Sequence, residues 1–164
     1  MEITGKVYAY GDNIDTDVII PARYLTVFDS ETLAAHCMED LDKNFSKTVA
    51  QGDVVTGGFN FGSGSSREHA PLALKASGVQ AVIAKSFARI FYRNCINIGL
   101  LVIENEILAD KLKNASNIKI DYDKKLITNL TDNESFVFEL PPFAAEILQA
   151  GGLVEAVKKG GFNV

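Results

Sequence analysis

Two short, mainly apolar runs constrain the fold of this chain more than any other feature: Val79–Ala84 and Leu100–Ile103. Such runs are typical of strands that are buried on both faces of a parallel sheet. The segment between them, Ser86–Ile98, has the length of a helix, with Ser86 placed to cap its start and Gly99 to end it. A strand, a helix and a second strand in this order predict a right-handed crossover between parallel neighbours.

The same pattern precedes these runs. Asp53–Thr56 is expected to be a strand, and the glycine-rich loop 58–64 follows it. We expect a helix over Ser66–Ser77, because Pro71 fits the first turn of a helix and Gly78 stands where a helix ends. Strands and helices that alternate in this way predict the parallel part of an α/β fold.

The two ends of the chain carry other patterns. After residue 117, three short strand-like stretches separated by polar turns predict an antiparallel meander. The further segments expected are strands at Ile3–Tyr10, Ile118–Tyr122, Leu126–Leu130 and Phe136–Leu140, a turn at 11–17, a loop at 21–28, and helices from Asp29 or Ser30 to Cys37, from Pro141–Pro142 onward and over Leu153–Lys159. No repeat or linker interrupts the chain, so we expect residues 1–164 to form a single α/β domain with mixed parallel and antiparallel strands.

The composition excludes several classes of protein. A balance of 47% apolar and 23% charged residues is that of a soluble globular protein. A net charge of −5 and the lack of a basic stretch argue against a nucleic-acid partner. No apolar run approaches the ~20 residues that cross a bilayer, and the first residues lack the apolar core of a signal peptide. We therefore expect a cytoplasmic protein with no membrane partner.

The cysteines argue against a metal site in this chain. Cys37 and Cys95 are far apart in sequence and form no CxxC pair. An iron–sulfur cluster needs three or four thiolates, so the chain cannot hold one alone. We predict no metal site here and expect Cys95 to belong to the core, with Cys37 as a small apolar filler or a surface thiol.

The segment from Gly62 to His69, of sequence GSGSSREH, is the most unusual part of the chain. Its glycines allow the backbone to adopt positive φ and to approach a ligand closely. The predicted helix start places free N–H groups and the positive end of the helix dipole near Ser65 and Ser66, where they favour an anion. Arg67 can bind a carboxylate through two parallel hydrogen bonds.

The residues of this segment leave other interpretations open. A glycine- and serine-rich stretch before a helix is often only a flexible loop that ends in a serine cap. A phosphate-binding loop is a second interpretation, although the patterns GxxxxGK[ST] and GxGxxG are not met. The GxSxG pattern of a nucleophilic serine is not present either. The spacing of His69 does not establish it as a base for Ser65.

Gly62–Ala70 resembles the serine loop of the mobile fourth domain of the aconitase family. The resemblance extends, in family order, to Gly11–Asp17, Ile20–Leu25, Ala84–Ile90 and Asn97–Leu101. It implies a single three-layer β/β/α swivelling domain. It also implies a hydro-lyase, an enzyme that removes water from its substrate and adds it back.

The resemblance implies a role for each matching residue. Ser65 would be the general base that removes the proton next to a carboxylate, and Asp17 would pair with a catalytic histidine on the cluster-bearing part of the enzyme. Arg67 would bind a substrate carboxylate, and Ser66 would hydrogen-bond the substrate. A hydroxyl is a weak base, so its alkoxide needs nearby amides and a cation, which the loop and Arg67 could provide. Three residues keep open roles: Arg23, Glu68 and His69.

The resemblance also implies a partner. A four-iron four-sulfur cluster is expected on a separate large subunit, where an iron acts as a Lewis acid on the hydroxyl that leaves and returns. The two chains would share one active site at their interface, and neither would be active alone. The substrate would be a small dicarboxylic acid of the malate type.

The segment Tyr24, Leu25 and Thr26 matches a loop that contacts the substrate side group in this family. Homoaconitase-like relatives place an arginine beside the Tyr-Leu pair to hold an extra carboxylate, whereas Thr26, Val27 and Phe28 stand here. Burying an unpaired carboxylate is costly, so an isopropylmalate of leucine biosynthesis is the implied substrate. Acting on 2-methylmalate, 2,3-dimethylmalate or homoaconitate is the alternative. A non-catalytic anion-binding or regulatory module is the alternative from a different class.

Overall fold

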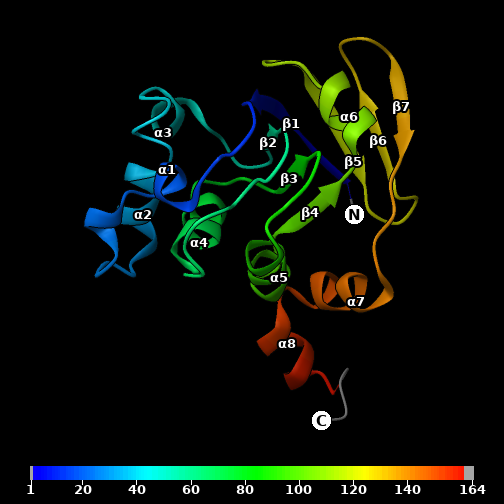
Figure 1. The fold of residues 1–164 in the computed structure, drawn as a ribbon. Helices are drawn as coiled ribbons and strands as arrows, with labels where there is room; N and C mark the ends of the chain where they lie inside the picture. The colour runs from blue at the N-terminus through cyan, green and yellow to red at the C-terminus, as the bar shows by residue number, and fades with distance from the viewer. Residues whose placement is uncertain (1, 161–164) are drawn as a thin grey trace.

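A seven-stranded sheet in the order β4-β3-β2-β1-β5-β6-β7 forms the centre of the computed structural model, which describes residues 2–160 (Figure 1). β1 (Glu2–Ala9) joins two halves of this sheet. Its first residues pair antiparallel with β5 (Asn117–Asp121), and its last residues pair parallel with β2 (Val54–Gly57). The remaining strands are β3 (Ala81–Ala84), β4 (Leu101–Glu104), β6 (Leu126–Asn129) and β7 (Glu134–Val137). The mixed sheet confirms the predicted α/β class.

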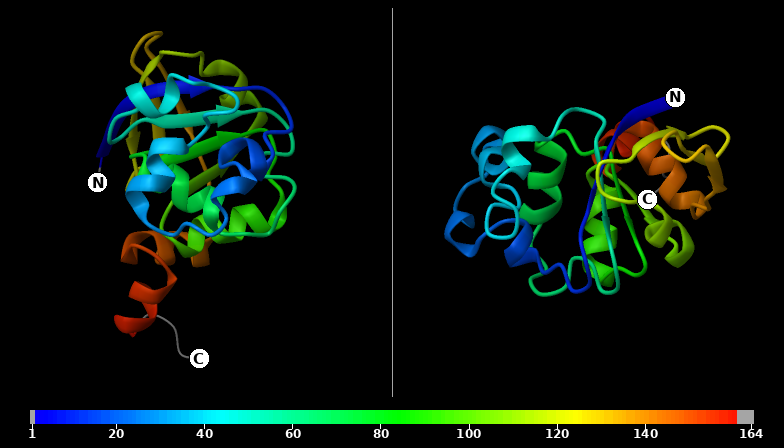
Figure 2. Two further views of the ribbon diagram at one scale, coloured as in Figure 1. Left: turned by 90° about the vertical axis from the view of Figure 1, so that its left-hand side faces the viewer. Right: turned by 90° about the horizontal axis from the view of Figure 1, so that it is seen from above.

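The strands of the parallel half are buried on both faces. In β3, Val82 and Ala84 belong to the apolar cluster beneath the helices, whereas Ala81 and Ile83 belong to the cluster beneath the antiparallel half. Successive side chains of a strand point to opposite faces, which explains why this run is apolar throughout. The helices between residues 16 and 97 lie on one side of the parallel strands, and the curled antiparallel strands lie on the other side together with the helix at 106–111 (Figure 2). The predicted three-layer β/β/α arrangement is confirmed.

Several helix ends follow local rules that the sequence predicts. Asp29 caps α2 by accepting the N–H of Thr32 at 3.0 Å. Gly78 and Gly99 adopt φ of 99° and 84° directly after the ends of two helices, where L side chains are disfavoured. The helices are α1 (Thr16–Ile19), α2 (Ser30–His36), α3 (Phe45–Thr48), α4 (His69–Ala76), α5 (Arg89–Asn97), α6 (Glu106–Lys111), α7 (Pro142–Ala150) and α8 (Leu153–Lys158), with a 3-10 turn η1 (Ala22–Tyr24).

The predicted start of α4 at Ser66 is wrong, since the helix begins at His69. The preceding backbone is engaged elsewhere: the N–H of Ser65 donates to Thr16 Oγ1 at 2.9 Å. The short helices α1, α3 and α6 were not predicted, because four to six residues are too few for a periodic apolar pattern. The serines that carry the expected chemistry therefore lie in an extended loop before the helix.

The predicted cap of α5 is also wrong. The helix begins at Arg89, after Ala88, and has no side-chain cap. The hydroxyl of Ser86 instead accepts the N–H of Asn60 at 2.7 Å. Ser86 thus fastens the loop after β2 to the end of β3, a tertiary contact that competes with the local capping role.

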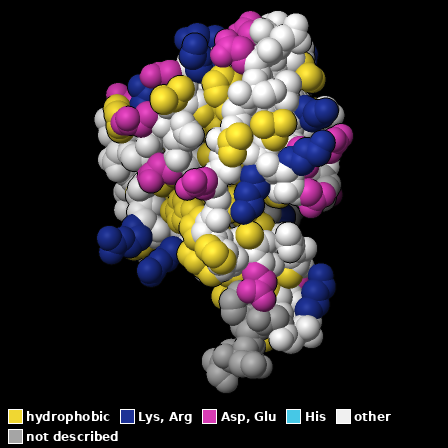
Figure 3. Space-filling view, turned by 90° about the vertical axis from the view of Figure 1, so that its right-hand side faces the viewer, with side chains coloured by type: hydrophobic (Ala, Val, Ile, Leu, Met, Phe, Trp, Pro, Cys, Tyr) yellow, Lys and Arg dark blue, Asp and Glu magenta, His cyan; other side chains and the backbone are white. Residues whose placement is uncertain are grey.

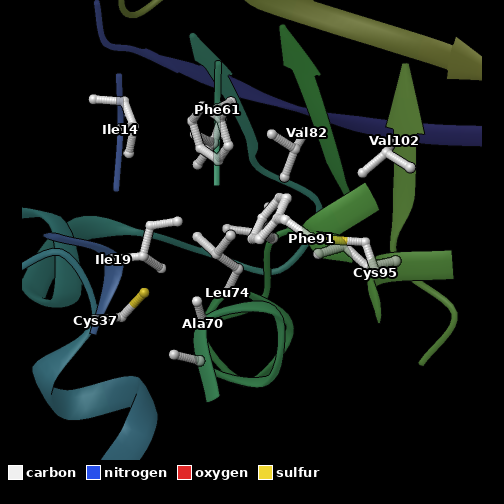
Figure 4. Close-up of a cluster of buried hydrophobic side chains, with 14 of the residues drawn as sticks. Ile14, Ile19, Cys37, Phe61, Ala70, Leu74, Val82, Phe91, Cys95 and Val102 are labelled. Carbon is white, nitrogen blue, oxygen red and sulfur yellow. The ribbon is translucent and has the colours of Figure 1, made fainter. Parts of the chain in front are cut away.

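Both cysteines lie in the apolar cluster beneath the helices (Figure 4). Cys37 and Cys95 are fully buried. Cys95 is the core residue that the sequence predicts, and Cys37 is an apolar filler and not a surface thiol.

Candidate active site

The residues singled out in the sequence meet at one edge of the sheet. β1 and β2 are parallel neighbours, so the segments that follow them leave the sheet at the same edge. Such edges, at the carboxyl ends of parallel strands, are where α/β proteins usually bind ligands. The segment after β1 contains Asp17, and the segment after β2, residues 58–68, contains Ser65 and Arg67. We call residues 58–68 the serine loop.

Three backbone contacts hold the serine loop against the segment 14–16. The N–H of Gly62 donates to the carbonyl of Ile14 at 2.7 Å, and the N–H of Thr16 donates to the carbonyl of Ser63 at 2.8 Å. The N–H of Ser65 donates to Thr16 Oγ1 at 2.9 Å. These bonds bring Ser65 close to the start of α1, where Asp17 lies.

Two glycines of the serine loop are required by their surroundings. Gly62 has a φ of 82°, and a Cβ there would lie 2.1 Å from Phe91 Cγ. Gly64 has a φ of 99°, and a Cβ there would lie 2.6 Å from a carboxylate oxygen of Asp15. At Gly62 the loop packs against α5, and at Gly64 it packs against Asp15, the residue that caps α1. The predicted positive φ of these glycines is confirmed.

Asp17, Leu25, Ser65 and Arg67 line one small hollow. Its volume is about 10 Å³, which is room for about one water and far less than the ~300–1,000 Å³ of a ligand pocket. The other lining residues are Thr16, Ile20, His69 and Ala70. The described residues therefore do not enclose a pocket of ligand size at this hollow.

The side chains in the hollow are arranged for an anion. The N–H of Arg67 donates to Ser65 Oγ at 3.3 Å. The guanidinium of Arg67 is exposed and forms no ion pair with any residue from 2 to 160, so it is available to a ligand. Ser66 is exposed beside the hollow, and its carbonyl accepts the side-chain N–H of Asn94 at 3.0 Å. Asn94 on α5 thereby positions the serine loop, a role that no local sequence pattern indicates.

Tyr24 and Thr26 lie outside the hollow that Leu25 lines. The hydroxyl of Tyr24 donates to a carboxylate oxygen of Glu39 at 2.9 Å, and its ring stacks on His36 at 4.1 Å. Thr26 is exposed on the loop before α2. Of the three residues predicted to contact the substrate side group, only Leu25 lines the hollow. The substrate role of this segment stays a prediction.

Arg23 is held by an acidic pair. Its guanidinium bonds Glu39 and also Asp40 Oδ1, the latter at 3.0 Å. Burial alone would raise the pKa of Glu39, but hydrogen bonds from His36, Tyr24 and Arg23 outweigh it, so the pKa is lowered. Glu39 therefore stays ionised and keeps Arg23 engaged.

His69 is a buried imidazole whose two nitrogens lack a hydrogen-bond partner among the residues that the structure describes. The residue is 6% exposed, and the ring of Phe28 lies 4.6 Å from its own. Neither ring nitrogen hydrogen-bonds to the start of α4, and Glu68 makes no side-chain cap there either. Leaving such groups unpaired costs about 1–3 kcal/mol, and functional sites are where such costs are usually found.

The aconitase C-terminal domain family matches residues 13–107, more than half of the chain. The chain belongs to this family. The match contains the serine loop, Asp17 and the segment around Tyr24, so the family resemblance seen in the sequence is confirmed.

Relatives within the aconitase C-terminal domain family extend the similarity to nearly the full chain. The 3-isopropylmalate dehydratase small subunit of Helicobacter hepaticus is 56% identical over 160 residues, 97% of each chain. The protein of the same name from Brachyspira hyodysenteriae is 53% identical over 96% of this chain and 98% of its own. A crystal structure of 3-isopropylmalate dehydratase from Methanocaldococcus jannaschii matches with a TM-score of 0.92 at 49% identity, over 98% of this chain and 96% of that chain.

The cysteines of this family member do not fit an iron–sulfur cluster. Burial raises the pKa of the Cys37 thiol to about 12 and that of Cys95 well above its usual value, so neither supplies a thiolate. Between residues 2 and 160, no three His, Cys, Asp or Glu side chains are grouped as metal ligands would be. Over the same residues, no helix has the length and apolar character to cross a membrane.

Because Gly64 is closely packed and Gly11 is not, replacing each with alanine should affect the free energy of unfolding differently. Gly64→Ala should destabilise the free chain by more than ~1 kcal/mol, because the new Cβ meets Asp15 at a φ that alanine disfavours. Gly11→Ala should leave stability unchanged or raise it by up to about 1 kcal/mol, since its Cβ has nothing within 4 Å. Urea unfolding of both variants measures this, and equal effects would contradict the loop geometry.

The unpaired nitrogens of His69 predict an unusual tolerance. His69→Leu should leave the stability of the free chain unchanged or raised, because an apolar side chain removes the cost of the unpaired groups. Asn129→Leu is the matched control: Asn129 is also buried, but its side-chain oxygen accepts the N–H groups of Thr131 and Asp132. That variant should lose about 1–3 kcal/mol. A comparable loss for both in thermal or urea unfolding would show that His69 has a partner in the free chain.

Proposed function

We propose that this chain is the small subunit of a 3-isopropylmalate dehydratase, a hydro-lyase that interconverts 2-isopropylmalate and 3-isopropylmalate in leucine biosynthesis. The observation that carries the proposal is an identity of 49% to 56% with proteins of that name over nearly the whole chain. The convergence of Ser65, Arg67 and Asp17 on one hollow supports it. Residues 1–164 would act as one swivelling domain.

Ser65 is the proposed general base. Its hydroxyl lies at the rim of the hollow and accepts the N–H of Arg67, so an alkoxide there would be stabilised by that amide and by the nearby guanidinium. The alkoxide takes the proton from the carbon next to a substrate carboxylate while the hydroxyl of the neighbouring carbon leaves. When water adds back in the opposite sense, the serine gives the proton to the carbon that had carried the hydroxyl. The backbone bonds to the segment 14–16 hold the hydroxyl in place during both steps.

Arg67 and Ser66 are the proposed substrate-binding residues. Arg67 is exposed and unpaired within residues 2–160, so its planar guanidinium can take a carboxylate in two parallel hydrogen bonds. The hydroxyl of Ser66 is exposed, and Asn94 holds the backbone at that position. Asp17 is proposed to pair with a histidine of the partner, because it lines the same hollow with an exposed carboxylate.

A large subunit that carries a four-iron four-sulfur cluster is the proposed partner. When bound there, the cluster supplies a Lewis acid for the hydroxyl that leaves and returns. The small volume of the hollow supports a shared site, since this chain alone cannot enclose a dicarboxylic acid. The free cysteines suit the reducing cytoplasm, which is the proposed location.

The segment 24–28 supports a substrate with an apolar side group. Phe28, which is 71% exposed, and Thr26, which is also exposed, are both uncharged. Neither therefore offers a charge to a third carboxylate. Arg23 is the nearest guanidinium in sequence, and Glu39 and Asp40 already hold it. A tricarboxylate such as homocitrate would leave one carboxylate without a cation, which is costly once desolvated. Smaller alkyl malates remain the alternative substrates.

Ser65→Ala tests the catalytic assignment. The variant should still assemble with the large subunit but lose at least ~100-fold in turnover, because a general base contributes about 10²–10⁴-fold. Ser46→Ala, the same change on α3 away from the site, should keep full turnover. The assay uses the reconstituted complex with 3-isopropylmalate, and assembly is followed by gel filtration. Unchanged turnover for Ser65→Ala in an active complex would favour a non-catalytic, anion-binding role for the loop.

Thr26→Arg tests the substrate assignment. The new guanidinium should raise KM for 3-isopropylmalate by about 10-fold or more and improve use of homoaconitate, since it can pair with an additional carboxylate. Ala35→Arg adds the same charge on the exposed side of α2 and should leave the preference unchanged. Steady-state kinetics over a panel of alkyl malates gives the ratio, and an identical preference in both variants would remove Thr26 from the substrate loop.

A further inference from the structure

One face of α5 remains exposed beside the serine loop. At 100° per residue, five side chains share one arc of this helix, and the opposite arc, with Phe91 and Cys95, lies in the core. This arc, which we call the α5 face, contains the exposed residues Arg89, Ile90 and Arg93 and the partly buried residues Asn94 and Asn97. Asn94 stands at one edge of this arc and donates to the carbonyl of Ser66 at 3.0 Å. The α5 face therefore begins where the candidate active site ends.

The other edge of the α5 face borders a groove of about 310 Å³ between α5 and α7. Its lining combines aromatic rings with charged groups: Phe87, Arg89, Tyr92, Arg93, Glu104, Pro141 and Phe143. Figure 3 shows this side of the molecule, with hydrophobic side chains gathered in a hollow, acidic side chains above them and basic side chains at the left edge. Phe143 in the groove and Ile90 on the α5 face are 51% and 53% exposed, so each part of this surface offers an apolar side chain to a partner.

The charges of this surface differ from those of the whole chain. The net charge is −5, yet Arg89 and Arg93 form no ion pair with any residue from 2 to 160. Arg67 in the serine loop is likewise unpaired, whereas Arg23, by α2, is held by Glu39 and Asp40. Unpaired arginines beside aromatic and apolar side chains are typical of interfaces, because guanidinium groups are weakly hydrated and stack on rings.

We propose that the α5 face and its groove bind the large subunit, with the groove receiving an apolar side chain flanked by carboxylates of that subunit. This inference rests on the proposed function, which requires a partner to close the hollow at Ser65. A surface that covers Ser66 must also cover Asn94 and Ile90, which lie on the same arc of α5, and it then meets the arginines at the far edge. Carboxylates of the partner would give Arg89 and Arg93 the counter-charges that this chain lacks.

A second copy of this chain fits the surface less well. Symmetric pairs place the same patch of both copies in contact. In such a pair the four arginines at positions 89 and 93 would share one interface, and the groove offers each copy only Glu104 as an acidic group to set against them. The chemistry of the α5 face therefore favours an acidic, partly apolar partner over self-association.

Arg93→Glu tests this interface in the reconstituted enzyme. Titrating the large subunit against a fixed amount of this chain should give an apparent Kd at least ~10-fold higher, because the reversed charge repels the acidic partner. Turnover at saturating large subunit should stay near that of the natural chain, since Arg93 does not line the hollow at Ser65. Ile90→Ser, which removes apolar contact only, should also raise Kd. Calorimetry without substrate gives Kd independently of activity.

Lys47→Glu is the matched control, since α3 lies well away from α5 in the views of Figures 1 and 2. It makes the same charge change and should leave Kd unaltered. If Arg93→Glu and Ile90→Ser both bind the large subunit with the Kd of the unaltered chain, and the unaltered chain activates that subunit, the proposed interface is overturned. Failure of the natural chain to bind or activate that subunit would instead overturn the proposed function. A change confined to self-association, seen by sedimentation of the free chain, would assign the face to a second copy and overturn the proposal.

Discussion

The backbone contact between the serine loop and the segment 14–16 is the interaction on which the rest of the site depends. It joins two connections that leave parallel neighbouring strands at one edge of the sheet. Ser65 donates its own N–H to Thr16 Oγ1, which holds its backbone in the loop before α4 and leaves its hydroxyl at the rim. The positive φ of Gly62 and Gly64 is a consequence of the same contact, since both positions press against neighbouring groups.

The site is rigidly built and yet incomplete. Hydrogen bonds from the segment 14–16 and from Asn94 hold the serine loop on two sides, while the hollow before it has room for about one water. Two polar groups at its edges have no partner among residues 2–160: the buried imidazole of His69 and the exposed guanidinium of Arg67. A surface with these properties is suited to contact with a second surface, and the relatives from Helicobacter hepaticus and Brachyspira hyodysenteriae are themselves called small subunits.

Local patterns in the sequence predicted most elements of the fold. Apolar runs identified β3 and β4, glycines marked the ends of α4 and α5, and Pro142 marked the start of α7. These signals succeed because burial and backbone conformation act on single residues and their near neighbours. Ser66 and Ser86 misled for the opposite reason, since a serine that can cap a helix can equally bond a distant strand or loop.

The sequence by itself determined the α/β class and the two glycines that shape the serine loop, and its resemblance to the aconitase family indicated Ser65, Ser66, Arg67 and Asp17, because motifs and patterns are local. Only the tertiary structure brought three of these residues to one hollow, placed Tyr24 and Thr26 outside it, and made Asn94 a support of the loop. It also left Arg67 unpaired while engaging Arg23. Which charge is neutralised and which hydroxyl is free depends on groups that are distant in sequence, and the packing of strands and helices decides those distances.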